Sequence, residues 1–305
     1  MNGIASALLP VMLLIALGFV LRRSGLVAEA AWAGLEKVAY YVFFPALLIY
    51  NLGGQSLQGV PWLPMLFVIL ATCCVAAVTL VLWHTVSRSV SGETFTSIFQ
   101  GGVRFNSYIA LAVCEAFYGD AGLAVGAIGI SFMIVIVNLM SVAAFGIWGS
   151  KGTIGFRSLL RDIAANPLIV ACTLGLVLSA SGLGLPELAA DTLGLIGRAA
   201  LPVGLLAVGA GVQLRAMRGH VRPVVAATVV QYLVKPLTAV LLIAGAGLEG
   251  AAAATLVIMF ITPVAASSYI LAKQLGGDTA AMASIVTLQT VLAFAVMPLG
   301  LALLL

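Results

Sequence analysis

The stretch Gln100-Gly-Gly-Val-Arg-Phe-Asn-Ser-Tyr108 places a positive charge, amides and hydroxyl groups inside an otherwise apolar segment, residues 95–117. That segment is close to the ~20 residues that a helix needs to cross the hydrocarbon core of a bilayer. A charged side chain at that depth is costly unless it is paired or hydrated, so such residues usually face a cavity. The stretch therefore predicts an interrupted membrane helix beside a polar cavity.

A second interruption is predicted at Thr262-Pro-Val-Ala-Ala-Ser-Ser-Tyr269, within the apolar segment 251–272. Pro263 removes a backbone donor and clashes with the preceding turn of a helix. Backbone groups freed at that depth persist only where protein or water satisfies them. We expect a discontinuous helix here as well. An ordinary proline kink beside small, closely packing residues is the alternative.

Apolar segments of similar length make up almost the whole chain. It is 63% hydrophobic and 8% charged, whereas soluble proteins are about a quarter charged. Almost nothing is left for a soluble domain, so we expect an all-α membrane protein whose function lies within the membrane. The ten segments are 4–21, 37–53, 61–83, 95–117, 122–148, 166–182, 192–211, 221–246, 251–272 and 281–304.

Lysines and arginines fall almost entirely into every second gap between these segments, beginning with the first gap. Short loops rich in Lys and Arg stay in the cytoplasm. The pattern predicts a multi-pass protein of the inner membrane with both termini outside the cytoplasm. The net charge of +4 comes from the cytoplasmic loops and does not indicate nucleic-acid binding. The residues that carry the pattern are Arg22, Arg23, Arg88, Lys151, Arg157, Arg161, Arg215, Arg218, Arg222 and Lys273.

Similar features recur in the same order in two halves of the chain. An odd number of spans in each half inverts the second half relative to the first, as in many secondary transporters. We therefore predict ten transmembrane helices in two inverted five-helix repeats, residues 1–149 and 166–305, joined by a cytoplasmic linker at 150–165. The recurring features are Pro45-Ala-Leu-Leu48 with Pro202-Val-Gly-Leu-Leu206, and Ser-Tyr-Ile at 107–109 with Ser-Tyr-Ile at 268–270.

Polar residues at and beside the two interruptions are the candidates for substrate binding. Asn138 and Gln289 either face the interruptions or join neighbouring helices. Lys235, well inside the eighth segment, is either a fixed cation for an anionic substrate or the partner of a buried acid. Arg104 either binds the substrate or extends to the cytoplasmic interface. The full set is Arg104, Asn106, Ser107, Tyr108, Asn138, Lys235, Pro263, Ser267, Ser268 and Gln289.

Motifs for catalysis or for a cofactor are not found in the sequence. It contains no phosphate-binding glycine loop, nucleophile elbow or HExxH run. His84 and His220 have no second ligand at metal spacing, and the four cysteines lie within apolar segments. We therefore expect no enzyme, no cofactor and no metal site. Glu36 and Lys37, at the mouth of the second segment, are expected only to mark the interface.

Several of these motifs resemble the auxin efflux carrier family, which includes the plant PIN-type exporters and bacterial malonate and malate permeases. The resemblance covers essentially the whole chain. The motifs are Leu21-Arg-Arg-Ser-Gly-Leu26, Tyr41-Val-Phe-Phe-Pro45-Ala-Leu-Leu48, Asn106-Ser107 followed by Ala116-Phe-Tyr-Gly119, Pro263 followed by Ala272-Lys273, and Ser284-Ile-Val286.

The resemblance implies a scaffold of helices 1, 2, 6 and 7, often dimeric, and a moving transport domain of helices 3–5 and 8–10. In that domain helices 4 and 9 unwind and cross beside the substrate, with Asn106 and Pro263 as crossover residues. The chain departs from the plant pattern at Phe105, where the plant carriers have proline.

These observations predict a secondary carrier of small organic anions, namely carboxylates, that works by alternating access. The resemblance implies that the carrier is a homodimer and that the carboxylates are auxin-like or malate-like. The substrate gradient, the membrane potential or a coupled proton or sodium ion would drive the carrier. A sodium-coupled carrier of the bile-acid symporter kind is a rival, but the transport helices embed only one acid, Glu115. A channel is less consistent with a two-fold repeat, because a channel pore is lined by symmetric rings. A sensor is less consistent as well, because the short loops leave no room for a signalling domain.

The predicted topology can be tested with cysteines introduced at Ser56 and Ser158, which lie in the second gap and in the linker. Because the charge pattern places these loops on opposite sides, a membrane-impermeant thiol reagent should label them from opposite sides. Labelling of both from one side would contradict the topology and the inverted repeat.

Overall fold

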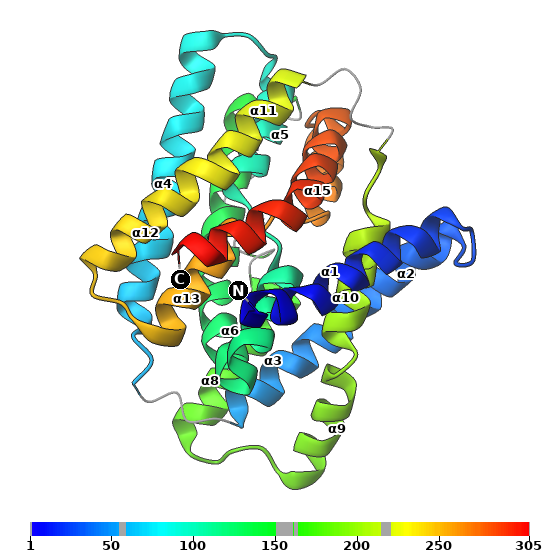
Figure 1. Ribbon diagram of the computed structural model, residues 1–305, viewed down its shortest axis with the longest axis vertical. Coiled ribbons are helices and arrows are strands. Elements are labelled where there is room, and N and C mark those ends of the chain that lie inside the picture. Colours follow the sequence, from blue (N-terminus) through cyan, green and yellow to red (C-terminus); the bar gives the residue numbers. More distant parts are fainter. Residues whose placement is uncertain (1, 55–58, 151–160, 162–163, 215–220, 305) are drawn as a thin grey trace.

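A computed structural model describes residues 2–54, 59–150, 161, 164–214 and 221–304, and all regular secondary structure among them is helical (Figure 1). Ser56, Ser158, His220 and most of the predicted linker lie outside the described residues. The helices are α1 Asn2–Arg23, α2 Glu29–Val38, η1 Ala39–Phe43, α3 Phe44–Gly53, α4 Trp62–Ser87, α5 Gly92–Val103, α6 Ser107–Trp148, α8 Pro167–Ser181, α9 Glu187–Gly197, α10 Ala200–Ala210, α11 Val221–Val229, η3 Val230–Val234, α12 Lys235–Gly245, α13 Gly250–Ile261, α14 Ser267–Leu275 and α15 Thr279–Leu304.

By length and composition, seven helical runs in the described residues can each cross a membrane. Two shorter apolar helices, α8 and α13, add to them. This confirms the predicted all-α membrane protein. The seven runs are Ser6–Arg23, Glu29–Gly53, Trp62–Ser87, Gly92–Trp148, Glu187–Ala210, Val221–Gly245 and Thr279–Leu304.

The longest of these runs changes direction at two places. The first is the interruption between α5 and α6. The second is Gly119 inside α6, with φ 57° and ψ −144°, a backbone conformation open mainly to glycine. Gly119 lies at the predicted gap between the fourth and fifth segments. The run is long enough to form two spans, and Gly119 is the point at which it can be divided into them.

The helices form two groups that differ in their packing partners. In the first group α1 packs against α10, and α3 packs against α8 and α9. In the second group α4, α5, α6, α11, α12, α13 and α15 pack against one another (Figure 1). The stacked rings of Phe44 in α3 and Tyr108 in α6, with centroids 4.2 Å apart, join the groups.

Glycines allow the closest contacts within the first group. A methyl group added to Gly18 would lie 2.0 Å from the Leu206 carbonyl oxygen, and one added to Gly209 would lie 1.8 Å from the Ile15 carbonyl oxygen. Between α3 and α8, a methyl group on Gly175 would lie 2.7 Å from Cβ of Leu52. Small residues let membrane helices approach in this way, so that backbone packs on backbone.

Helices α1 and α8 also end with the same hydrogen bonds. Ser24 Oγ donates to Leu21 O at 3.0 Å, and Gly25 adopts a positive φ of 74°. Ser181 Oγ donates to Leu178 O at 2.9 Å, and the next residue, Gly182, has a φ of 69°. Both helices therefore end with a glycine cap preceded by a serine.

We expect Gly209→Ala to destabilise the protein by about 1–3 kcal/mol, the usual cost of an overpacked core, because its methyl group meets the backbone of α1. Gly146→Ala is the matched control, since nothing lies within 4 Å of its added methyl group, and it should lie within about 1 kcal/mol of wild type. Thermal unfolding in detergent measures both. Equal midpoints would contradict the backbone contact between α1 and α10.

Candidate functional site

The chain leaves the helix at the first predicted interruption, which we call the first break. Helix α5 ends at Val103, and α6 begins at Ser107. Asn106 has extended φ and ψ of −102° and 102°, and its Oδ1 accepts hydrogen bonds from the N–H groups of Tyr108 (3.0 Å) and Ile109 (3.2 Å). Asparagine is among the best residues for such an N-cap, and the break forms with Phe105 in place of the plant proline.

Helix α13 ends at Ile261 and α14 begins at Ser267, and the second break lies between them. Thr262 has extended φ and ψ of −73° and 151°, and Pro263 follows it. The backbone N–H of Asn106 donates to Thr262 Oγ1 at 3.4 Å, so the two breaks are in contact.

Gln289 of α15 connects the same two breaks through its side chain. Its Oε1 accepts from the Val264 N–H at 2.9 Å, and its Nε2 donates to Gly101 O at 2.9 Å. The side chain is completely buried. Gln289 therefore faces the interruptions and also joins neighbouring helices, but it does not line the cavity.

Lys235 and Gln231 connect the breaks from a third direction. Lys235 Nζ donates to Val103 O (3.1 Å), Arg104 O (3.0 Å) and Gln231 Oε1 (2.8 Å). Gln231 Nε2 donates to Thr262 O in turn. From the sequence, Lys235 is predicted to be either a cation for the substrate or the partner of a buried acid. Its hydrogen bonds go instead to backbone carbonyls and an amide.

A π-helical turn sets the position of these two side chains. Pro236 is the second residue after η3, and its missing N–H and bulky ring are accommodated by the wider turn. The same device recurs where η1 precedes Pro45. There it sets the direction of Tyr40 and Tyr41 beside the cavity.

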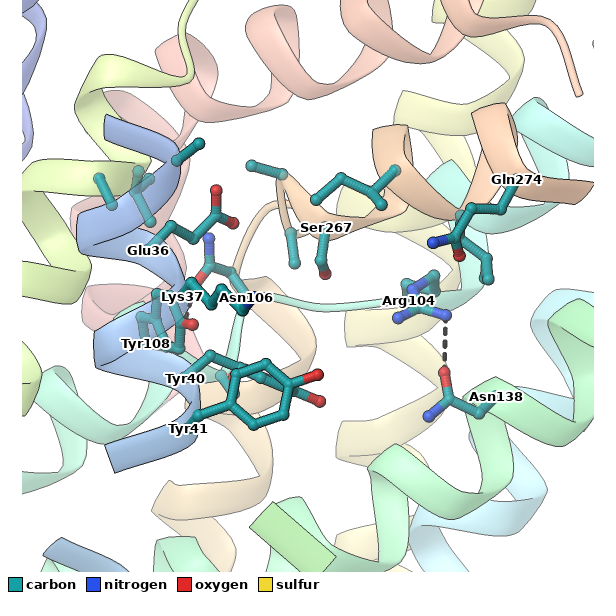
Figure 2. Close-up of a pocket in the computed structure, with 18 residues that line it drawn as sticks. Glu36, Lys37, Tyr40, Tyr41, Arg104, Asn106, Tyr108, Asn138, Ser267 and Gln274 are labelled. Carbon is teal, nitrogen blue, oxygen red and sulfur yellow. Dashed lines mark hydrogen bonds between the residues drawn. The ribbon is translucent and has the colours of Figure 1, made fainter. Parts of the chain in front are cut away.

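A cavity of about 470 Å³ lies beside the first break, between α2, η1 and α14 (Figure 2). Arg104 and Gln274 lie on one side of it, and Glu36 and Lys37 on the other. Arg104 donates to Asn138 Oδ1 at 2.8 Å, and its Nε has no hydrogen-bond partner among the described residues.

Six of the ten candidate residues line this cavity, and four do not. Lys235, Pro263, Ser268 and Gln289 lie behind it at the breaks, where Ser268 O accepts a hydrogen bond from Gln100 Nε2 at 3.4 Å. The six that line it are Arg104, Asn106, Ser107, Tyr108, Asn138 and Ser267.

The cavity wall formed by α2 and η1 is missing from the predicted site. Glu36 and Lys37 were expected only to mark the interface, yet both line the cavity together with Tyr40 and Tyr41. The signal was present in the sequence, because residues three or four apart, such as Lys37 with Tyr40 and Tyr41, share one face of a helix. Gln274 is a further lining residue, and no pattern in the sequence points to it.

Residues 153–301 match a family described as membrane transport protein. The matched residues make up just under half of the chain, and over them the sequence is similar to that family. The match confirms the resemblance to the auxin efflux carriers. An uncharacterized transporter of Methanothermobacter thermautotrophicus is similar as well, with 24% identity over 302 residues and 97% of each chain covered. The apolar helices and this similarity indicate a multi-pass membrane protein, and the cavity at the two breaks is the candidate substrate site.

Proposed function

We propose that this protein is a secondary carrier that moves small organic anions, with a carboxylate as the bound group, by alternating access. The observation that carries the proposal is the guanidinium of Arg104 on the cavity wall. One of its nitrogens is held by Asn138, and its Nε has no partner among the described residues. Arginine presents a planar fork of donors that matches a carboxylate.

The cavity has the size and the lining expected for such a substrate. Binding sites for small molecules are typically about 300–1,000 Å³ with mostly apolar walls and a few polar groups. Apolar side chains such as Val208, Ile270 and Leu271 cover part of the wall. Lys37 adds a second positive charge, which the neighbouring Glu36 offsets, so Arg104 remains the net positive charge of the lining. The N-terminus of α6 at Ser107 also borders the cavity, and a helix N-terminus favours an anion.

The proposed architecture is ten helices in two inverted repeats, residues 1–149 and 166–305. The contacts support it, because α1 packs on α10 and α8 packs on α3. In each pair, the first helix of one half packs on the second helix of the other half. The sequences Leu-Gly-Phe-Val-Leu-Arg-Arg-Ser-Gly-Leu at 17–26 and Leu-Gly-Leu-Val-Leu-Ser-Ala-Ser-Gly-Leu at 174–183 support it further.

Five pairs of residues have the same separation along the chain, two of them inside these two sequences and three outside them. They relate features of matching kind, including the packing glycines, the glycine caps and the two breaks. The pairs are Pro10 with Pro167, Gly18 with Gly175, Gly25 with Gly182, Pro45 with Pro202 and Asn106 with Pro263.

In the proposed cycle the first helix group is a scaffold, dimeric as in the related carriers, and the second group carries the substrate. The cavity borders both groups. Glu36 follows the first basic gap, and Gln274 adjoins Lys273, so the cavity lies toward the side predicted to be cytoplasmic. We therefore assign the structure to an inward-facing state of an inner-membrane protein with both termini outside the cytoplasm.

The membrane potential is sufficient to drive export of such an anion. A single negative charge that leaves a cell with a negative interior gains ~2.3 kcal/mol per 100 mV. Counterflow in proteoliposomes against a panel of radiolabelled carboxylates tests the function. Saturable exchange of at least one carboxylate is expected, and a complete lack of exchange would contradict the proposal.

We expect Arg104→Gln to raise the half-saturation concentration for the carboxylate at least about tenfold, because hydrogen bonds to charged groups contribute roughly 1.5–3 kcal/mol. Arg104→Lys should recover only part of the loss, since lysine lacks the planar fork. Arg198→Gln, outside the cavity lining, is the control. If both Arg104 variants transported with unchanged half-saturation, Arg104 would not bind the substrate.

Two asparagines with the same capping role separate stability from transport. Asn106 caps α6, and Asn166 caps α8 through the N–H groups of Leu168 (3.0 Å) and Ile169 (3.4 Å). Asn106→Ala and Asn166→Ala should each cost about 1 kcal/mol of stability, as lost N-caps do. Only Asn106→Ala should also abolish counterflow, because Asn106 borders the cavity itself, whereas Asn166 reaches it only through a hydrogen bond with the lining residue Tyr40. Normal flux in that variant would reduce Asn106 to a structural cap.

A further inference from the structure

Lys235 lies between the two breaks with all of its donors directed at oxygen atoms of the protein. Its Nζ is within 3.1 Å of Val103 O, Arg104 O and Gln231 Oε1. An ammonium group has three N–H donors, one for each of these acceptors, whereas a neutral amine would leave one acceptor without a hydrogen. The hydrogen bonds therefore match the charged form of Lys235.

Two of the three acceptors belong to the negative end of the broken helix α5. Val103 and Arg104 lie at the C-terminus of α5, where a helix carries roughly half a negative charge. Gln231 extends the contact to the second break, because its Nε2 donates to the carbonyl of Thr262 at the end of α13. The Phe260 ring, 5.8 Å from Nζ, adds a cation–π contact.

The orientation of the Gln231 amide is determined by these two contacts. Its oxygen must face the Lys235 ammonium, which only donates, and its nitrogen must face the Thr262 carbonyl, which only accepts. Gln231 and Lys235 are both completely buried. A single positive charge thus serves the first break directly and the second break through one amide.

Carbonyl oxygens of unwound segments and the C-terminal ends of half-helices are the groups that coordinate Na⁺ in secondary transporters. In this protein the corresponding oxygens already contact Lys235 and Gln231. We propose that Lys235 is a built-in cation that takes the place of a metal ion at the two breaks, so that the carrier works without Na⁺. The part that concerns transport rests on the proposed function.

The wild-type protein tests this proposal without any substitution. Thermal unfolding in detergent and carboxylate counterflow are compared in NaCl, KCl and choline chloride at equal ionic strength. We expect the same unfolding midpoint and the same flux in all three salts. A saturable increase of either quantity that is specific to Na⁺ would overturn the proposal.

Two substitutions test the role of the ammonium itself. Lys235→Ser removes the charge and leaves space beside the carbonyls, whereas Lys235→Met removes the charge and fills the space. We expect the unfolding midpoint of Lys235→Ser to rise with NaCl but not with choline chloride, and that of Lys235→Met to respond to neither. A folded Lys235→Ser protein without a response to Na⁺ would overturn the assignment, since a merely structural lysine would give that result.

The two readouts keep this inference separate from the proposed function. Unfolding midpoints require no substrate, so they report on Lys235 even if no carboxylate is exchanged. A lack of exchange with normal salt responses would contradict the proposed function alone. If neither variant folds, the salt comparison of the wild-type protein decides the question.

Discussion

The backbone carbonyls released at the two breaks impose the main constraint on this structure. Helices α5 and α13 both end inside the protein, where water is scarce and an unsatisfied carbonyl is costly. Lys235, Gln231 and Gln289 supply the missing donors. These three side chains come from the helices on either side of the breaks, so the position of the breaks and the packing of the second helix group depend on each other.

The breaks themselves could be predicted from the sequence, because each is signalled locally. Polar residues within an apolar run mark the first, and Pro263 marks the second. The partners could not be predicted in the same way. Gln231 is a single amide in an apolar segment, and only the tertiary structure places it beside Thr262, 31 residues along the chain. Lys235 was recognised as unusual, but its partners are carbonyls that every residue possesses, and these leave no trace in a sequence.

The cavity was predicted in part for a related reason. The side that borders the first break contains Arg104 and Asn138, which are conspicuous in apolar segments. The opposite side is formed by Glu36 and Lys37 on a helix that begins near the interface, where charged residues are ordinary. Their role depends on α2 and α14 lining the same cavity. Helix α2 packs on α10, and Gly18 and Gly209 permit contact between the backbones of α1 and α10.

The same contacts limit how the proposed carrier can move. Gln289 forms hydrogen bonds to both breaks with one side chain, and Lys235 and Gln231 together connect the breaks a second time. Separation of α5 from α13 would therefore expose several carbonyls at once. The second helix group should therefore move as one unit. Between the groups, by contrast, the stacked rings of Phe44 and Tyr108 form a contact without hydrogen bonds between them. Sliding along such a contact leaves no polar group of the two rings unpaired. The boundary also contains hydrogen bonds from Cys172 Sγ to Ala127 O (3.8 Å) and from the Gln213 N–H to Thr287 Oγ1 (3.0 Å). In the proposed cycle these few bonds would exchange partners while the ring contact slides.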